Sequence, residues 1–445
     1  MSAGSKLKIS LPHSKQSPYK GNVWPILTKD LEKLRSSPSA NLLEATILKY
    51  LNRNLDARQR VQSLQNLRAV FSQQPEGGAQ IIAYIAESAL KLPQLFPDGS
   101  LPGLVRGTPG LVELSRGEVC CLLAHMLLCS LLVQEELRPE YCGHFTGAQA
   151  PTGPLTFCYW LYHQSNATNI YLRTLLTYFT HHQTLSQGEL EEKVTFQRFV
   201  CAETEKSWDP TTESAGSQMI AEVGLHLDGR IGDLEQVEVD FANKHVGFGT
   251  TATQEELLLG TSPESCVVVL FNEVLEAEES LLITGARRFG DYSGYGRAAR
   301  YTGTFSPSWN WRERKILAID ALSHPSDQLG DVTMRRELRK AWRGFSSVRG
   351  SRLSTGHWGC GAFGGDQSIK CLLQVIAASL AGVKLDFYCF GDKTFHAAFQ
   401  SALRVMEGKS VEWVWSRIVQ YRAVKVKGGR SVLNYISSEL GVVQE

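Results

Sequence analysis

Two adjacent carboxylates follow a short glycine loop in the middle of the chain. The segment Val239–Gly260 has the sequence VDFANKHVGFGTTATQEELLLG, and Glu255 and Glu256 stand near the expected start of a helix. Gly247 and Gly249 open the loop, and glycine permits both positive φ angles and close backbone approach. A strand leading into such a loop directs several backbone N–H groups to one point, where they can bind a phosphate. Taken alone, the pattern is more typical of a solvated helix cap.

A second loop is richer in glycine. Residues Thr355–Asp366 have the sequence TGHWGCGAFGGD, with five glycines in twelve residues, and they precede an amphipathic helical pattern. A glycine-dense loop at a helix start suits a phosphate, although a tight turn without a ligand gives the same pattern. His357 in this loop, like His245 beside the first loop, could be an acid–base group or a merely polar loop residue. Two such loops in one domain predict a diphosphate held from two sides.

Aromatic side chains flank both loops. Tyr292 and Tyr295 lie in the segment DYSGYG, whose glycines are expected to expose both rings. Phe363 lies inside the second loop, and Phe390 ends an apolar run. Aromatic rings beside a phosphate loop can stack on a base or cover a ribose. At the end of a strand, however, Phe390 also fits an ordinary core.

The elements that must position these residues alternate between strands and helices from about residue 195 onward. Expected strands span residues 236–241, 266–271, 281–284, 317–321 and 385–390, and expected helices span 253–259, 334–342, 365–380 and 395–406. The runs VVVLF and ILAIDA are nearly unbroken apolar stretches, typical of strands covered on both faces. This alternation predicts an α/β fold in which a sheet lies between helices. Ligands of such sheets bind beyond the carboxyl ends of the strands, where the first glycine loop also falls.

The first half of the chain is expected to be mostly helical. Helical patterns cover residues 26–67, with a break at 36–39, and then 79–90, 119–132 and 167–181, whereas residues 139–154 are expected to form a loop. Ser115 and Glu118 give a capping-box pattern before an apolar run. We predict a flexible leader over residues 1–20, a helical accessory domain over 21–194 and an α/β domain over 195–445.

Composition narrows the classes of function. The chain has 445 residues, of which 43% are hydrophobic and 20% charged, as expected of a globular protein with more than one domain. A net charge of +1 gives no global attraction to nucleic acid or to an anionic membrane, so neither is an expected partner. The ten cysteines include no C-x-x-C pair, which favours reduced, buried thiols in an intracellular protein, in the nucleus or the cytoplasm, over a metal site.

Seven segments, in this order, resemble the catalytic region of the poly(ADP-ribose) glycohydrolase family: VDFANK, QEE, ITGARRFGDYSGYG, AIDAL, MRRELRKAW, TGHWGCGAFGGD and FGD. The similarity covers about residue 42 to the C-terminus. It implies a macrodomain-like mixed sheet between helices, preceded by a mostly helical accessory region. It also implies hydrolysis of the ribose–ribose O-glycosidic bonds of poly(ADP-ribose), without a metal or cofactor, on free polymer and on poly(ADP-ribosyl)ated proteins.

The resemblance further implies roles for single residues. Glu256 matches the catalytic carboxylate and Glu255 its partner, while Asp233 is the nearest counterpart of an acidic residue that contacts adenine. The implied substrate-binding residues are Asn243, Gly247, Gly249, Gln254, Tyr292, Tyr295, Gly361, Ala362, Phe363 and Phe390. Because adjacent residues on a helix point about 100° apart, both carboxylates cannot face one oxygen. A single Glu is therefore expected to act as acid and then as base.

The first glycine loop departs from the family pattern. The family has three consecutive glycines and about seven residues before QEE, whereas this chain has GFG, with Phe248 in the middle, and then only Thr250–Thr253. A misplacement of ~1 Å can cost ~10²-fold in rate, so the shorter loop could impair catalysis. Three functions stay open: an active glycohydrolase, a macrodomain that binds ADP-ribose chains without cleaving them, and a helical interaction protein on an α/β scaffold.

Overall fold

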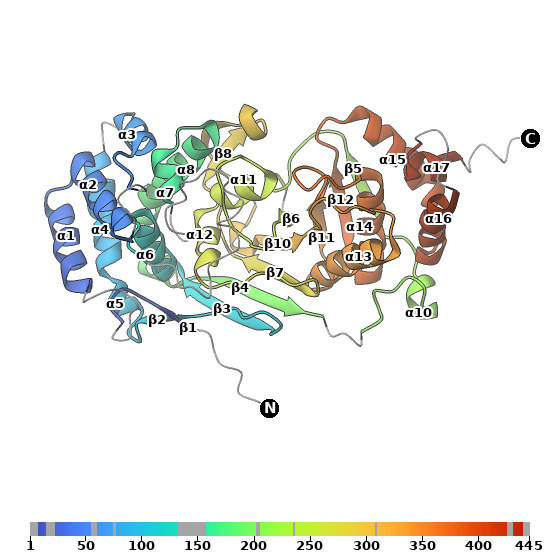
Figure 1. The fold of residues 1–445 in the computed structure, drawn as a ribbon, viewed down its shortest axis with the longest axis horizontal. Helices are drawn as coiled ribbons and strands as arrows, with labels where there is room; N and C mark the ends of the chain where they lie inside the picture. The colour runs from blue at the N-terminus through green and yellow to red at the C-terminus, as the bar shows by residue number, and fades with distance from the viewer. Residues whose placement is uncertain are drawn as a thin grey trace, which may run out of the picture.

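An eight-stranded mixed sheet crosses the molecule, with the N-terminal helices at one end and the C-terminal helices at the other (Figure 1). The strands, in their order across the sheet, are β3 (Gly110–Ser115), β4 (Lys193–Val200), β7 (Glu279–Thr284), β10 (Lys315–Asp320), β6 (Val237–Ala242), β11 (Arg352–Thr355), β12 (Lys384–Tyr388) and β5 (Val223–His226). Neighbouring strands from β3 to β10 are antiparallel to each other, and neighbouring strands from β10 to β5 are parallel. The computed structural model describes residues 8–14, 23–54, 60–73, 77–131, 157–201, 205–234, 236–307, 309–424 and 430–438.

Alternate residues of the central strands face two separate cores. On β10, Ile316 and Ala318 pack on the side of the N-terminal helices, while Leu317 and Ile319 pack on the other side. The second core is covered by α13 (Asp331–Ser346), α14 (Gln367–Ala381), α15 (Lys393–Met406), α16 (Val411–Val424) and α17 (Val432–Ser437). The predicted α/β fold, with its sheet between helices, is confirmed.

The N-terminal half supplies the predicted helices and also an edge strand. Its longer helices are α1 (Trp24–Ser36), α2 (Ala40–Leu51), α3 (Gln65–Ser72), α4 (Gly78–Leu90), α6 (Arg116–Leu127) and α8 (Asn166–His182), with the shorter α5 (Leu92–Leu95), α7 (Cys158–Tyr162) and α9 (Gln187–Glu191). The Ser115–Glu118 capping box at the start of α6 forms as predicted. The loop predicted at 139–154 lies outside the described residues.

Two local predictions are wrong. Residues 266–271 form no strand, because α12 (Pro263–Cys266) and a 3₁₀ turn (Val267–Leu270) occupy this segment. A short apolar run cannot by itself distinguish a strand from a buried helix, and the proline at the start of α12 favours the helix. Part of the predicted flexible leader is also ordered, since β1 (Lys8–Ser10) pairs with β2 (Ser100–Pro102) and buries Ile9.

The two halves of the chain share one core. A continuous cluster of buried residues runs from the N-terminal helices to Ala242, Leu257 and Ala318 of the α/β half. Arg116 of α6 adds a buried ion pair with Glu264 of α12, at Nη1–oxygen distances of 2.5 and 2.7 Å. Packing is therefore continuous across the domain boundary predicted at residue 194.

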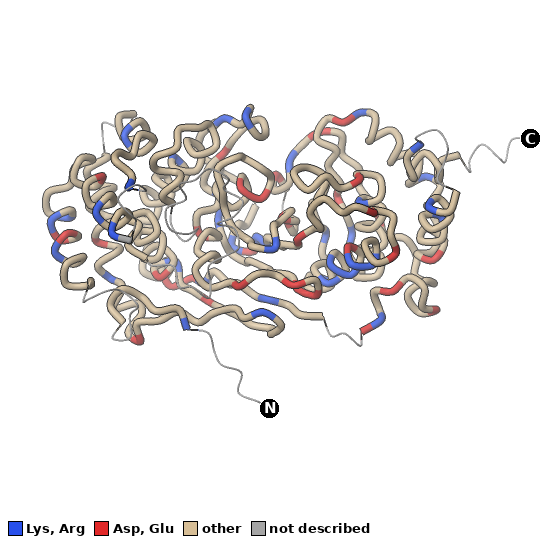
Figure 2. Tube along the Cα trace, viewed as in Figure 1, with Lys and Arg blue, Asp and Glu red and all other residues tan. Residues whose placement is uncertain are grey.

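Charged residues are spread over the whole trace. Lys and Arg positions are mixed with Asp and Glu positions over the trace, in keeping with the net charge of +1 (Figure 2). No helix among the described ranges has both the length and the apolar character needed to cross a membrane.

We expect the Arg116→Met variant to be strongly destabilised, because it leaves Glu264 buried without its charge partner. Breaking such a pair costs ~3–5 kcal/mol. Urea denaturation measures this as a fall in the free energy of unfolding. The matched control is Lys91→Met, since the exposed Lys91–Glu87 pair contributes ~0–1 kcal/mol. Equal stability of the two variants would contradict a stabilising role for the buried Arg116–Glu264 pair.

Candidate active site

Both glycine loops lie at the same edge of the sheet. The first follows β6, the second follows β11, and Phe390 follows β12. These three strands are adjacent and parallel, so their carboxyl ends meet at one edge. Ligands of α/β sheets bind outside this edge.

Gln254, the first residue of α11 (Gln254–Gly260), fastens this helix to β6. Its Oε1 accepts the Phe241 N–H at 2.8 Å, and its Nε2 donates to the Val239 carbonyl at 3.0 Å. The amide side chain thus extends the hydrogen bonding of the strand onto the helix and sets where α11 begins.

The buried carboxylate of Glu255 fixes the segment that leads from β6 into the first loop. One oxygen accepts the Asn243 N–H and the other the Gly247 N–H, each at 3.0 Å. Only 7% of Glu255 is exposed. Burial and then the nearby charge of Asp240 raise its pKa, against the opposing effect of these two N–H donors.

Glu256 points to the other side of α11, where it closes a capping box with Thr253. Its Oε2 accepts hydrogen bonds from the Thr251 N–H (2.7 Å), the Thr251 hydroxyl (2.7 Å) and the Thr253 N–H (3.2 Å). Its Oε1 lies beside Gly249, where an added Cβ would come within 1.9 Å. A side chain at position 249 would therefore displace this carboxylate.

Asp240 is a further carboxylate that the sequence did not single out. It lies on the inner face of β6, is fully buried, and neither carboxylate oxygen has a hydrogen-bond partner among the described residues. Burial, followed by the charge of Glu238, raises its pKa to about 8. No signal in the sequence marked its burial, because Asp240 falls on the polar face of the alternating pattern in this strand.

The second loop is closed by its own backbone. Gly359 has a φ of 72°, and an added Cβ would lie 2.5 Å from Ala321. The Gly365 N–H donates to the Gly359 carbonyl at 2.9 Å, and the indole of Trp358 donates to the Ile319 carbonyl at 2.9 Å. At its tip, Gly361 and Ala362 are exposed and Phe363 is half-buried.

Tyr295 lies between the two loops. The N–H of the next residue, Gly296, donates to the Ala252 carbonyl at 3.1 Å, which attaches this segment to the first loop. On the other side, a Cβ added to Gly361 would lie 3.8 Å from the Tyr295 hydroxyl. Burial and then the charge of Glu256 raise the pKa of this hydroxyl. The two loops are thus close together, and 58% of Tyr295 remains exposed.

Phe390 holds an uncommon backbone conformation beside the second loop. Its φ is 51°, and 47% of the residue is exposed. A Cβ added to Gly356 would lie 2.7 Å from its ring. A bulky residue with positive φ is strained, and such strain clusters at functional sites. Phe390 therefore belongs to this edge rather than to the core.

Tyr292 differs from expectation. It is half-buried, and the guanidinium groups of Arg230 and Arg288 lie 5.1 and 5.0 Å from its ring centre. The expected exposure of both tyrosines is thus wrong for Tyr292, because cations cover its ring. Asp233 pairs with Arg230 at 3.1 Å in the same cluster.

The two loop histidines have different surroundings. The backbone N–H of His245 donates a hydrogen bond to Asn243 Oδ1 at 3.0 Å. The His357 ring packs edge-on against Phe395, with 4.7 Å between ring centres, and burial lowers its pKa. Low polarity around His357 disfavours its protonated form.

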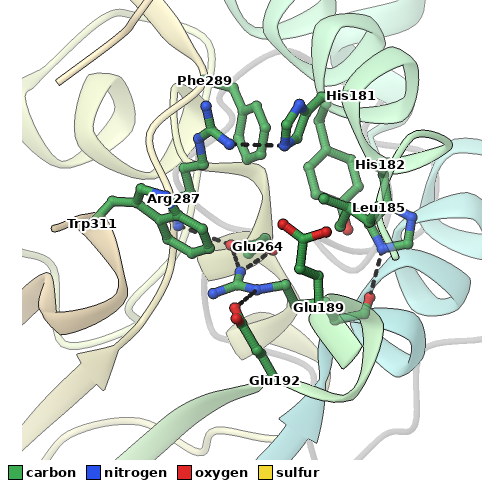
Figure 3. A pocket seen from close by; sticks show the side chains of 11 residues that line it. His181, His182, Leu185, Glu189, Glu192, Glu264, Arg287, Phe289 and Trp311 are labelled. Carbon is green, nitrogen blue, oxygen red and sulfur yellow. Dashed lines mark hydrogen bonds and ion pairs between the residues drawn. The ribbon is translucent and has the colours of Figure 1, made fainter. Parts of the chain in front are cut away.

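A pocket lies apart from the two loops, where α6, α8 and α9 meet the α/β half (Figure 3). Its lining includes Arg116, Glu264, Arg287 and Trp311, and none of the predicted site residues. Arg287 donates to His181 Nε2 at 2.8 Å, as Figure 3 shows. Its cavity volume of about 10 Å³ is roughly the space of one water molecule, far below the usual range of ligand pockets. Within the described ranges, no cluster of His, Cys, Asp or Glu could hold a metal ion.

Comparison with known proteins places both halves in one family. The model described as "Poly (ADP-ribose) glycohydrolase (PARG), Macro domain fold" matches residues 209–397, and "Poly (ADP-ribose) glycohydrolase (PARG), helical domain" matches residues 78–198. Together these ranges cover well over half of the chain.

Individual relatives agree. The chain is 29% identical to poly(ADP-ribose) glycohydrolase 1 of Caenorhabditis elegans over 288 residues, which are 59% of this chain and 36% of the relative. It is 34% identical to poly(ADP-ribose) glycohydrolase 2 of that organism over 181 residues, or 35% of this chain and 37% of the relative. With the probable poly(ADP-ribose) glycohydrolase 2 of Arabidopsis thaliana it shares 27% over 261 residues, or 46% and 50%. The chain thus spans half or less of the length of these relatives.

We expect the buried Asp240 to make stability depend on pH. Its pKa is about 8 in the folded protein and ~3.9 in an unfolded chain, so between these values only the folded state keeps the proton. Stability should therefore fall as pH rises from about 4 to 8, by up to ~1.4 kcal/mol per pH unit for one proton.

The Asp240→Asn variant should show a shallower decline, because Glu255, whose pKa is also raised, still contributes to it. Urea denaturation at pH 5, 6.5 and 8 measures it, with Glu87→Gln as an exposed carboxylate control. Identical slopes for the wild type and Asp240→Asn would show that Asp240 is ionised in the folded state.

Proposed function

This chain belongs to the poly(ADP-ribose) glycohydrolase family, and we propose that it hydrolyses the ribose–ribose O-glycosidic bonds of poly(ADP-ribose) and releases ADP-ribose. One observation carries the proposal: the Glu256 carboxylate and the exposed tip of the second loop both lie near the Tyr295 hydroxyl. A carboxyl group that can reach a sugar linkage therefore stands beside a loop suited to a diphosphate.

In this scheme the diphosphate lies along Gly361, Ala362 and Phe363, where an exposed glycine loop offers backbone N–H groups. Tyr295 and Phe390, both about half exposed, cover adenine and the adjacent ribose. The ligand-binding role of the second loop does not require a metal, because backbone dipoles supply the positive field.

Glu256 acts as the general acid and then as the general base. It donates a proton to the leaving ribose oxygen while the glycosidic bond breaks, and then takes a proton from the attacking water. Its Oε1 is the reactive oxygen, since Oε2 is occupied by three donors of its own loop. Glu255 faces the other way, and we assign it the task of holding Asn243 and Gly247 in place.

The second candidate is a macrodomain that binds ADP-ribose chains without cleaving them. The observation that favours it is the same capping box, because a carboxylate held by its own helix start is not free to follow a substrate.

Poly(ADP-ribosyl)ated proteins are the proposed partners in both cases. The nine described cysteines form no disulfide, which supports a reducing compartment such as the nucleus or the cytoplasm.

We expect Glu256→Gln to lower the rate of ADP-ribose release from poly(ADP-ribose) by ~10²–10⁴-fold, the usual contribution of a general acid–base group. Glu189→Gln is the matched control, because Glu189 closes the same kind of capping box at α9. This variant should release ADP-ribose at the wild-type rate.

The results separate the two candidates. Equal rates for Glu256→Gln and the wild type would remove Glu256 from catalysis. If the wild type bound the polymer but released no ADP-ribose, the second candidate would stand instead.

We also expect Gly249→Ala to lower kcat by ~10²-fold, because the new Cβ pushes the Glu256 carboxylate away from its position. Gly188→Ala, with nothing within 4 Å of the added Cβ, is the control and should keep the wild-type kcat. Initial rates at saturating polymer measure the difference. An unchanged kcat in Gly249→Ala would mean that catalysis uses another position of Glu256.

A further inference from the structure

Phe248, the residue that interrupts the first glycine loop, packs against the helical half of the chain. Its ring centre lies 5.0 Å from that of Phe157 and 4.9 Å from that of Trp160. Phe157 and Trp160 stack on each other at 4.4 Å with an interplanar angle of 17°. The side chain is therefore held among aromatic residues of the helical half instead of filling space beside the second loop.

Trp160 also holds the loop backbone. Its indole N–H donates to the Gly249 carbonyl at 2.8 Å, and only 1% of the residue is exposed. Trp160 is itself fixed, because its carbonyl accepts from Asn66 Nδ2 at 2.6 Å and its ring lies 5.0 Å from Tyr171. A rigid part of the helical half thus contacts two consecutive loop residues.

The anchored residues stand next to the proposed catalytic group. Gly249 borders Glu256 Oε1, and only four residues separate it from the start of α11. One of these, Ala252, is buried with a φ of 58°, a conformation that L-residues rarely adopt. A short, strained loop keeps such a conformation only where its surroundings determine it.

We propose that Phe248 and Trp160 form a latch through which the helical half positions Glu256. The inference rests on the proposed function, because its kinetic consequence concerns that carboxylate. Where the family pattern has a longer loop with a glycine at this point, this chain has a shorter loop with an aromatic anchor. The anchor restricts the loop to one conformation, in which Gly249 leaves room for Glu256. Phe248 and Trp160 are positioning residues, since neither side chain touches the substrate in this scheme.

The experiment uses the full chain with Phe248→Gly, which removes the anchoring ring, and Trp160→Phe, which keeps a ring but removes the N–H donor. The double variant is included, and Phe196→Leu is the control. Phe196, like Trp160, is fully buried and packs against an aromatic ring, Phe271, but it lies on β4 rather than beside either loop. Three quantities are measured: kcat on poly(ADP-ribose), the Kd of ADP-ribose by calorimetry, and amide hydrogen exchange over residues 247–256.

Each latch variant should lower kcat by ~10–100-fold, because Glu256 is no longer held in place. The Kd of ADP-ribose should change less than about threefold, since the second loop and Phe390 follow β11 and β12 rather than β6. Exchange over residues 247–256 should quicken about tenfold through loss of one hydrogen bond or ring contact. The double variant should lose less than the product of the single losses, because both residues act on one element.

Other results would overturn the latch. A parallel loss of kcat and ADP-ribose affinity would show a general structural effect, as would faster exchange throughout the chain. So would a fall in kcat of the same size in Phe196→Leu. If the wild type released no ADP-ribose at all, the proposed function would fail, whereas the exchange over residues 247–256 would still decide whether the latch exists.

Discussion

The buried carboxylate of Glu255 is the contact on which the geometry of this edge depends. By accepting the N–H groups of Asn243 and Gly247, it fixes both ends of the segment that leaves β6. Together with the Gln254 amide, it joins the strand to α11 and so determines which face of the helix is left for Glu256. Burying a carboxylate is costly, and the neighbouring Asp240 adds to that cost. A stability cost of this kind is typical of positions kept for function.

Much of the fold could be predicted from the sequence because the strands at its centre obey simple periodicity. β6, β7, β10 and β12 all lie within two residues of their predicted bounds, since each is a short apolar or alternating run next to a turn. The strand prediction for the run VVVLF fails because a short apolar run does not distinguish a strand from the 3₁₀ turn that these residues form after α12. The domain boundary predicted at residue 194 could not show that β3, from the helical half, pairs with β4 in the same sheet.

The candidate site was predictable in its parts but not in their orientation. The motif residues Gln254, Glu255 and Glu256 could be found, yet the division of work among them depends on which backbone groups each one meets. The sequence could not predict where the Phe248 side chain points, because its partners Phe157 and Trp160 stand about ninety residues earlier in the chain. Asp240 was missed because an acidic residue in a strand normally indicates a solvent-facing position, whereas here it faces the core.

The same contacts bear on whether the helical half could be a separate interaction module. A separate module would have its own core, and its interface with the α/β half would resemble a contact between two protein surfaces. Here the core is continuous across both halves, and Trp160 donates its indole N–H to the loop beside Glu256. A shortened loop also has fewer conformations available, so a single well-placed contact restricts it more than it would a longer one. The loss of three residues and the gain of Phe248 are therefore better understood together, as one change in how the loop is held, than as two separate defects of a phosphate-binding loop.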